Sequence, residues 1–563
     1  MVADKTFLMK WRHMGTAAER RALRQGKILV PPRYTARITT IDINTPLSWS
    51  AFANFEETFK FWINNCKFLR PCFSFTNRSQ GLSLLERILF EWVQQNPMDN
   101  PATDRAWDGH ATGIRAEILS AAWTAGIKES WLAQTIAAHA EFLAISENYQ
   151  GKWNHGLDQS LGLFALGIAI DREDWIKLAT SRIFDILEAL VDSQGVAIEQ
   201  AVDYQEYVYL QILHVISRFQ SAEISLPPEL ETRVNKMPLF LAHALQPNGI
   251  LSPLGDSRGA PLHCEAIVPT VEYSATQGHS GLIPDANYVI YDAGYVFWRS
   301  GWGENTSFEN EIHYTLRYGP ARIIHGHNDH TSITYYSNGQ EIIIDPGFDG
   351  YTPGPFRDYF RSPAAHNVAY CREAKFLWNA YTYLVNYNVF PSWQSYYLQD
   401  APHPNTNRKR CLLFVQSPLE VICIMDFIQG NHSCTYQQYW HFHHSLRPEV
   451  NNSHIRFGAQ GFDVNLFQTW PIETINIIQG ETNPIAGWAS SSTPSRITTP
   501  TVITTRNGIF ASFLTVIVFS KKNAICSVTQ RPLHNKERKL IVSDGRTEAH
   551  IKLTKDGFDL ISQ

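Results

Sequence analysis

The densest group of residues able to do chemistry is the segment His325-Gly326-His327-Asn328-Asp329-His330. Side chains two apart on an extended strand share a face, so His325 and His327 are expected to point the same way, and Gly326 permits close approach of a ligand or another chain. Histidine and carboxylate together form a ligand set suited to zinc. A polar rim of hydrogen-bonded histidines explains the spacing equally well.

Two further polar clusters precede this segment. Asn154, His155 and Asp158 stand at the start of a helical stretch, where Asn and Asp commonly cap helices and a histidine is commonly packed. Glu199 and Tyr204 precede the next helical stretch, where a lone tyrosine usually belongs to the core. Taken alone, both clusters indicate structure more than catalysis.

The residues before position 285 have the spacing of amphipathic helices. Between about 80 and 245 apolar residues repeat at helical intervals, as in Ile183, Ile186 and Leu190. Residues 246–261 are rich in Pro, Gly, Asn and Ser, which break helices. We therefore predict an N-terminal segment of unknown role (1–80), a helical domain (81–285) and a third region (286–563).

The third region has the pattern of antiparallel strands. Short β-branched and aromatic runs alternate with turn residues, and Asn338-Gly339 separates the runs 333–337 and 340–345. An Asn-Gly pair between alternating runs is a strong hairpin signal. The prediction is an α+β multidomain chain that ends in an antiparallel β-sandwich.

The composition excludes several classes of protein. A chain of 563 residues with 44% hydrophobic and 18% charged residues has ample material for folded cores. A formal net charge of -5 argues against a nucleic-acid binder. Eight cysteines without a Cys-x-x-Cys pair predict reduced, mostly buried thiols and neither a zinc ribbon nor a disulfide framework.

The cellular location is predicted from missing apolar runs. Residues 1–24 lack the apolar core of a signal peptide, and no later stretch is long enough to span a membrane. The expectation is a soluble, cytoplasmic protein, or a periplasmic or secreted one if a leader has been trimmed from the sequence.

The polar motifs, in their order along the chain, resemble those of the heparinase II/III-like polysaccharide lyase family. Between about residues 107 and 380 the motifs that carry the resemblance are Asn154-His155, Glu199 to Tyr204, Gly255-Asp256-Ser257, His325-Gly326-His327-Asn328-Asp329, Asp345-Pro346-Gly347 and Ala365-His366-Asn367. The resemblance implies an (α/α) toroid followed by an antiparallel β-sandwich, with a catalytic cleft where the two meet.

The resemblance also implies a reaction. The family removes the C5 proton of a uronic acid and expels the glycosidic oxygen at C4, which leaves an unsaturated uronate. By position, Asn154 and His155 would neutralise the substrate carboxylate. Tyr204 would protonate the leaving oxygen, in some members also acting as the base, and His325 would be the other acid/base group.

Further residues are assigned to the substrate and to a metal. Substrate contacts are expected from Arg115, Asp158, Glu199, Arg357 and Arg361, the three arginines as a positive environment for the tyrosine. Family precedent assigns a structural zinc to His327, Asp345 and His366. Asn328, His330 and Gln205 depart from the residues common in the family, which leaves the substrate subclass open.

Two other interpretations are retained. The fold without catalysis would give a glycan-binding or glycan-processing protein of capsule or exopolysaccharide assembly. A zinc-dependent hydrolase would lose all turnover to a chelator, whereas a lyase would mainly lose stability. The expected partner is a uronic-acid-containing polysaccharide or oligosaccharide, with heparan-type, alginate-type and bacterial capsular glycans all compatible.

Overall fold

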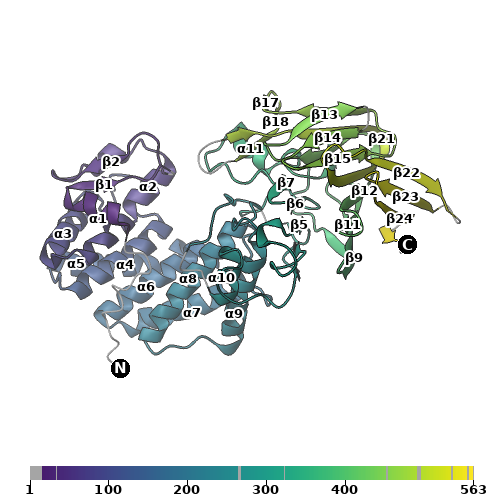
Figure 1. Cartoon of the computed structure of the whole chain (residues 1–563). Helices are drawn as coiled ribbons and strands as arrows, with labels where there is room; N and C mark the ends of the chain where they lie inside the picture. The colour runs from purple at the N-terminus through teal and green to yellow at the C-terminus, as the bar shows by residue number, and fades with distance from the viewer. Residues whose placement is uncertain are drawn as a thin grey trace. The chain divides into compact units, whose positions relative to one another are not determined.

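The computed structural model describes residues 15–32, 34–263, 268–321, 324–451, 454–490, 496–533, 537–554 and 557–561. Helices occupy the N-terminal part of the chain and antiparallel sheets the C-terminal part (Figure 1), as predicted. The change from helices to strands falls between Ala275 and Tyr288. The fold class predicted from the sequence is therefore confirmed.

The α-helices described before this change range from seven to twenty residues in length. They are α1 (Ala17–Arg24), α2 (Glu57–Asn64), α3 (Arg78–Gln95), α4 (Gly109–Ala125), α5 (Ser130–Ala144), α6 (Asn154–Ile170), α7 (Glu173–Leu190), α8 (Val202–Ser221), α9 (Pro228–Ala244) and α10 (Pro269–Ala275). A two-stranded sheet, β1 (Lys27–Leu29) with β2 (Thr40–Asp42), lies among the first of them. The apolar face predicted for α7 is buried at Ile183, Ile186 and Leu190, as helical periodicity requires.

The chain divides into two compact units. The first contains residues 1–195 and 207–235, and the second contains residues 196–206 and 236–563. The division runs through α8 and α9, so the first turn of α8 belongs to the second unit. The domain limits predicted at residues 80 and 285 stay predictions.

Within the first unit, α4 and α6 pack closely because glycines face the contact. A Cβ atom on Gly162 would lie 2.4 Å from the Gly113 carbonyl oxygen, and one on Gly113 would lie 2.6 Å from the Asp158 carbonyl oxygen. Any larger side chain would push the two helices apart. This contact fixes the first turn of α6, where Asn154 and His155 lie.

The strands of the second unit form three main sheets. The first sheet has the order β3 (Tyr288–Tyr291), β4 (Tyr295–Arg299), β5 (His313–Arg317), β6 (Ile333–Ser337) and β7 (Gln340–Ile343). Its β6–β7 hairpin turns at Asn338 and Gly339, both with positive φ, as the Asn-Gly pair predicts.

The second sheet is the largest. Its main path runs through β13 (Arg447–Asn451), β14 (His454–Gly458), β15 (Phe462–Gln468), β21 (Thr501–Lys521), β12 (Val421–His441), β11 (Asn407–Val415), β10 (Trp393–Asp400) and β9 (Tyr383–Phe390), with β8 (Ala369–Cys371) on β12 and β16 (Thr474–Ile478) on β21. The third sheet comprises β22 (Ser527–Pro532), β23 (Arg538–Ser543), β24 (Glu548–Thr554) and β25 (Gly557–Leu560). Two short pairs are β17 (Glu481–Thr482) with β18 (Ile485–Ala486) and β19 (Trp488–Ser490) with β20 (Arg496–Thr498).

The large sheet is covered on both faces. Trp298, Tyr314 and Tyr335 of the first sheet share one buried apolar cluster with Phe414 and Trp440 of the large sheet. A second cluster joins the opposite face of the large sheet to the third sheet, through side chains such as Leu514, Val516, Leu540 and Ile551. The predicted sandwich thus carries an additional layer, because β11, β12 and β21 present apolar side chains to both sides.

Cysteine usage agrees with the prediction. In the described part of the chain, Cys66, Cys72, Cys371, Cys411, Cys423 and Cys434 are free and buried, and Cys526 is free and half-buried. Cys264 lies outside the described residues.

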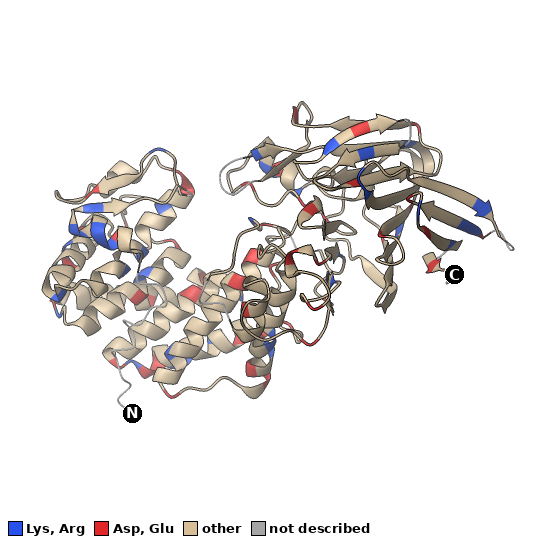
Figure 2. Ribbon diagram, viewed as in Figure 1, with Lys and Arg blue, Asp and Glu red and all other residues tan. Residues whose placement is uncertain are grey.

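Among the described helices, none combines the length and apolar character needed to cross a membrane. Basic and acidic residues are interspersed along the ribbons of both units (Figure 2).

Candidate active site and metal centre

Tyr204 and His325 are stacked face to face within the second unit. Their ring centroids are 3.5 Å apart and the rings are inclined by 11°. The Tyr204 hydroxyl is hydrogen-bonded to the hydroxyl of Tyr351, which in turn lies 3.5 Å from Nδ1 of His325. The first turn of α8 thus presents a phenol directly against an imidazole.

The carboxylate of Asp256 organises this group. Its two oxygens contact Nδ1 of His325 at 3.1 Å, Nε2 of His327 at 2.9 Å and the guanidinium of Arg357. Burial raises the pKa of Asp256, but the hydrogen bonds from the two histidines and Arg357 outweigh it and hold the pKa well below its ordinary value. An ionised carboxylate can only accept, so both imidazoles donate to it.

This constraint fixes one tautomer for each histidine. His325 carries its proton on Nδ1, which leaves the lone pair on Nε2, 3.6 Å from a carboxylate oxygen of Glu199. His327 carries its proton on Nε2, which leaves the lone pair on Nδ1. Asp256 therefore contacts two neighbouring histidines through different ring nitrogens, Nδ1 of His325 and Nε2 of His327.

The pKa values of the stacked pair favour neutral side chains. Burial raises the pKa of Tyr204, and the negative charges of Glu199 and Asp256 add to the effect, although the hydrogen bond with Tyr351 opposes it. Burial lowers the pKa of His325, and Arg357 and Arg361 reinforce this lowering against the pull of Asp256. A neutral phenol is a proton donor and a neutral imidazole a proton acceptor.

Of the predicted substrate contacts, Glu199 and Arg357 lie in this group. The Glu199 side chain is fully buried beside His325. Arg357 lies in α11 (Pro355–Arg361), and its guanidinium is ion-paired with Asp256 and 5.5 Å from the Tyr351 ring centroid. Arg361 ends the same helix, and its backbone oxygen accepts from the Asn328 amide. Their roles as substrate contacts stay predictions.

A second polar cluster lies in the first unit. Asn154 and His155 open α6, and the His155 ring stacks on His110 with centroids 4.0 Å apart. Nε2 of His110 lies 2.7 Å from the Asp158 carboxylate, which also accepts from the Tyr207 hydroxyl. Burial raises the pKa of Asp158, but contact with His110 outweighs it, so the pKa is lowered.

Arg115 lies elsewhere, in the core of the first unit. Its side chain is fully buried, and its nitrogens donate to the Asn64 carbonyl oxygen, the Thr112 hydroxyl and Nε2 of His139. The guanidinium also stacks 3.8 Å from the Trp92 ring centroid. With its donors satisfied inside the helical core, this placement favours a structural role for Arg115 over the predicted substrate contact.

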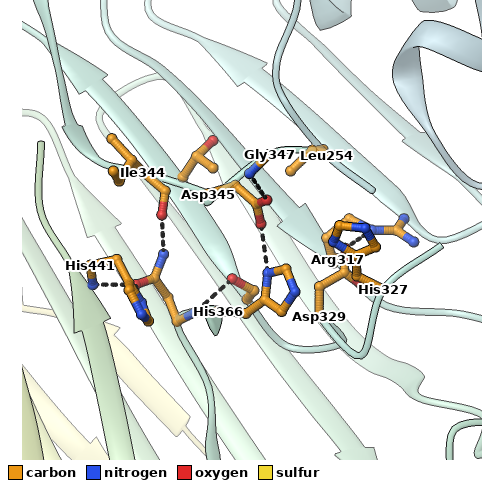
Figure 3. A network of polar contacts seen from close by, with 12 residues as sticks. Leu254, Arg317, His327, Asp329, Ile344, Asp345, Gly347, His366 and His441 are labelled. Atoms are coloured by element: carbon orange, nitrogen blue, oxygen red, sulfur yellow. Dashed lines mark hydrogen bonds and ion pairs between the residues drawn. The ribbon is translucent and has the colours of Figure 1, made fainter. Parts of the chain in front are cut away.

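The three predicted metal ligands come together. Donor atoms of His327, Asp345 and His366 all lie within 4.8 Å of one another, and all three residues are buried. Nδ1 of His366 lies 2.9 Å from one Asp345 oxygen, in a hydrogen bond, and the Gly347 amide donates to the other oxygen. Both contacts are drawn as dashed lines in Figure 3. Nδ1 of His327 and Nε2 of His366 are buried without a hydrogen-bond partner among the described residues. Two buried imidazole nitrogens without a hydrogen-bond partner, next to a carboxylate, fit zinc.

Buried polar side chains hold the segments that carry these ligands. The amide of Asn367 donates to the carbonyl oxygens of Ile333 and Ile344 and accepts from the His441 amide. Arg410 is ion-paired with Asp426 and donates to the carbonyl oxygens of Thr331 and Asn367. The large sheet thereby fixes the chain shortly after His327 and directly after His366.

Sequence reasoning did not assign a role to several residues of the two clusters. Asp256 was noted only within the Gly-Asp-Ser motif, and Tyr351 and His110 were not considered. Tyr351 follows the Asp-Pro-Gly motif in a glycine-rich loop that starts beside the metal ligands. Its place shortly after this motif is the feature of the sequence that could have identified Tyr351 as a candidate site residue.

Comparison with known proteins agrees with this geometry. Residues 284–522 match the family model described as heparinase II/III-like, C-terminal. The structure resembles heparinase III (TM-score 0.78, 14% identity, covering 96% of this chain and 91% of that chain). It also resembles heparan sulfate lyase HepC from Pedobacter heparinus (TM-score 0.72, 14% identity, 100% and 92%). Among curated proteins, none matches the chain in sequence. Residues 284–522 therefore match the C-terminal part of the heparinase II/III-like family, and the fold of the chain is similar to that of heparinase III.

Proposed function

We propose that the protein is a lyase that cleaves a uronic-acid-containing polysaccharide or oligosaccharide by β-elimination. The observation that carries the proposal is the stacked pair of Tyr204 and His325, a neutral phenol against a neutral imidazole. The likeness of the fold to heparinase III and to a heparan sulfate lyase supports the same reaction class.

In the proposed reaction, His325 accepts one proton from the substrate and Tyr204 donates one proton to it. Nε2 of His325 accepts the C5 proton of the uronate, a C4–C5 double bond forms, and the C4–oxygen bond breaks. The Tyr204 hydroxyl donates its proton to the departing oxygen. Asn154 and His155 are assigned the neutralisation of the substrate carboxylate, a role that rests on the resemblance alone.

A panel of uronic-acid glycans tests the function directly. We expect at least one of heparan sulfate, alginate and bacterial capsular polysaccharides to yield products with the ultraviolet absorbance of an unsaturated uronate. Cleavage without that absorbance would indicate a hydrolase, and binding without cleavage would indicate a glycan-binding protein. We further propose that the protein is cytoplasmic and that it holds a structural zinc.

Zinc binding gives the first prediction about residues. If His327, Asp345 and His366 hold a structural zinc, His366→Ala lowers both the zinc content and the melting temperature, because two buried ligands lose their cation. The measurement is elemental analysis with thermal unfolding, and His432→Ala, at an exposed histidine, is the matched control. Protein without zinc at this triad after purification in zinc-containing medium would contradict the assignment.

Asp256 gives the second prediction, as a positioning residue. His325 and His327 donate to different oxygens of Asp256, and Asp256→Asn replaces one of these oxygens by an NH2 donor. One histidine then faces a donor in place of its acceptor. We expect kcat to fall by about tenfold or more, the effect typical of losing a partner that orients a ligand or base, with a smaller change in KM.

Measurement of the histidine tautomers distinguishes a positioning role of Asp256 from a general loss of stability. Nitrogen chemical shifts should show the Nδ1–H form of His325 depleted in Asp256→Asn and unchanged in the control Asp358→Asn, which alters an exposed carboxylate of α11. An unchanged tautomer in Asp256→Asn would remove the proposed role of Asp256.

A further inference from the structure

A second group of potential metal ligands lies where β8 pairs with β12, apart from the residues assigned above. Donor atoms of Cys371, Glu373 and Cys434 all lie within 4.8 Å of one another. Cys371 ends β8 and is opposite Tyr436 on β12, two residues from Cys434. Strand pairing therefore brings together two thiols that are far apart in the sequence.

We propose that Cys371, Cys434 and Glu373 form a separate site for a thiophilic divalent cation such as zinc or cadmium. Two thiolates and one carboxylate are a ligand set for such cations, and a tetrahedral ion needs one further ligand. Glu373 is exposed, so a water molecule has access to the fourth position. This inference does not depend on the proposed lyase activity.

The position of Glu373 distinguishes the group from ordinary packing of cysteines. The two thiols are buried in a small apolar cluster with Ile428, Phe513 and neighbouring residues. Oε2 of Glu373 nevertheless lies 3.8 Å from Sγ of Cys371, held there by a 2.9 Å hydrogen bond from the Thr435 amide. A backbone group thus fixes an anionic oxygen at the open side of the thiol pair.

Binding exchanges protons for the cation. Burial raises the pKa of Cys371 to about 12, and the neighbouring Cys434 adds to the effect. The Cys371 thiol is therefore protonated without metal, and a divalent cation that binds its thiolate must displace that proton to the solvent. Affinity should rise with pH for this reason.

Cadmium titration of the reduced protein tests the site. Cadmium bound by thiolates gives a charge-transfer absorption that the sulfur-free triad of His327, Asp345 and His366 cannot produce. We expect one equivalent of cadmium to produce this band. Cys371→Ser should remove it, whereas Cys526→Ser, which alters a half-buried thiol outside the group, should retain it.

Glu373→Gln keeps the test valid if a cysteine variant does not fold. This exposed substitution should leave the band but weaken cadmium binding by about tenfold or more. His327→Ala should leave the band intact, which separates this site from the proposed zinc site. Absence of the band in reduced protein, its persistence in Cys371→Ser, or unchanged affinity in Glu373→Gln would each overturn the proposal. Rapid formation of a Cys371–Cys434 disulfide with no cadmium binding after reduction would identify a redox pair instead.

Discussion

Replacing Tyr204 with phenylalanine is expected to lower turnover at least ~10²-fold, the typical contribution of a general acid or base, while the fold and substrate affinity persist. The variant keeps the ring that stacks on His325 and removes only the hydroxyl. Since burial and nearby carboxylates raise the pKa of Tyr204, the hydroxyl is a proton donor in the resting protein. Its loss leaves the departing glycosidic oxygen without that donor.

Tyr351→Phe is the matched control for this prediction. The two hydroxyls are the two ends of one hydrogen bond, so each variant breaks the same contact. We expect Tyr351→Phe to retain most of the turnover, because Tyr204 keeps its proton. The measurement is the steady-state rate of both variants on the glycan that the panel identifies as a substrate. Full activity in Tyr204→Phe, or a larger loss in Tyr351→Phe, would contradict the assignment of the acid.

Local patterns predicted those parts of the fold that depend on neighbouring residues. The Asn338-Gly339 turn and the buried face of α7 follow from backbone conformation and helical spacing, both of which are encoded within a few residues. The additional layer made by β22 to β25 was not predicted. Whether a strand is covered on one face or both depends on which distant strand reaches it.

The candidate site, like the fold, was predictable only in part from the sequence. The three proposed metal ligands could be named from the family resemblance, and the structure brings them together. The hydrogen bonds of His325 and His327 with Asp256 could not be predicted. They join residues 69 and 71 positions apart, and such pairs form only in the folded chain. Arg115 shows what position along the chain cannot reveal: an arginine near a motif suggests a substrate contact, but its stacking on Trp92 in a helical core is invisible in the sequence.

The other large effect is expected from His325→Ala, which should abolish activity and spare the metal. His325 and His327 are two residues apart and share the Asp256 carboxylate. In the proposed reaction Nε2 of His325 takes the C5 proton, and no residue among its described contacts offers an equivalent neutral base. The side chain of His325 contacts Asp256, Glu199, Tyr204 and Tyr351 but is not a proposed metal ligand, so we expect a smaller change in melting temperature than for His327→Ala.

His327→Ala should give the reverse order of effects. Its Nδ1 is one of the two buried imidazole nitrogens without a hydrogen-bond partner at the proposed metal site, so its removal should release zinc and lower the melting temperature. Activity should fall as a consequence, because loss of the metal loosens the segment that carries His325. Zinc content, melting temperature and initial rate measured on both variants separate the two roles. Equal loss of zinc from both variants would make His325 a structural residue, and retention of zinc in both would leave the three buried side chains as a hydrogen-bonded cluster without a cation.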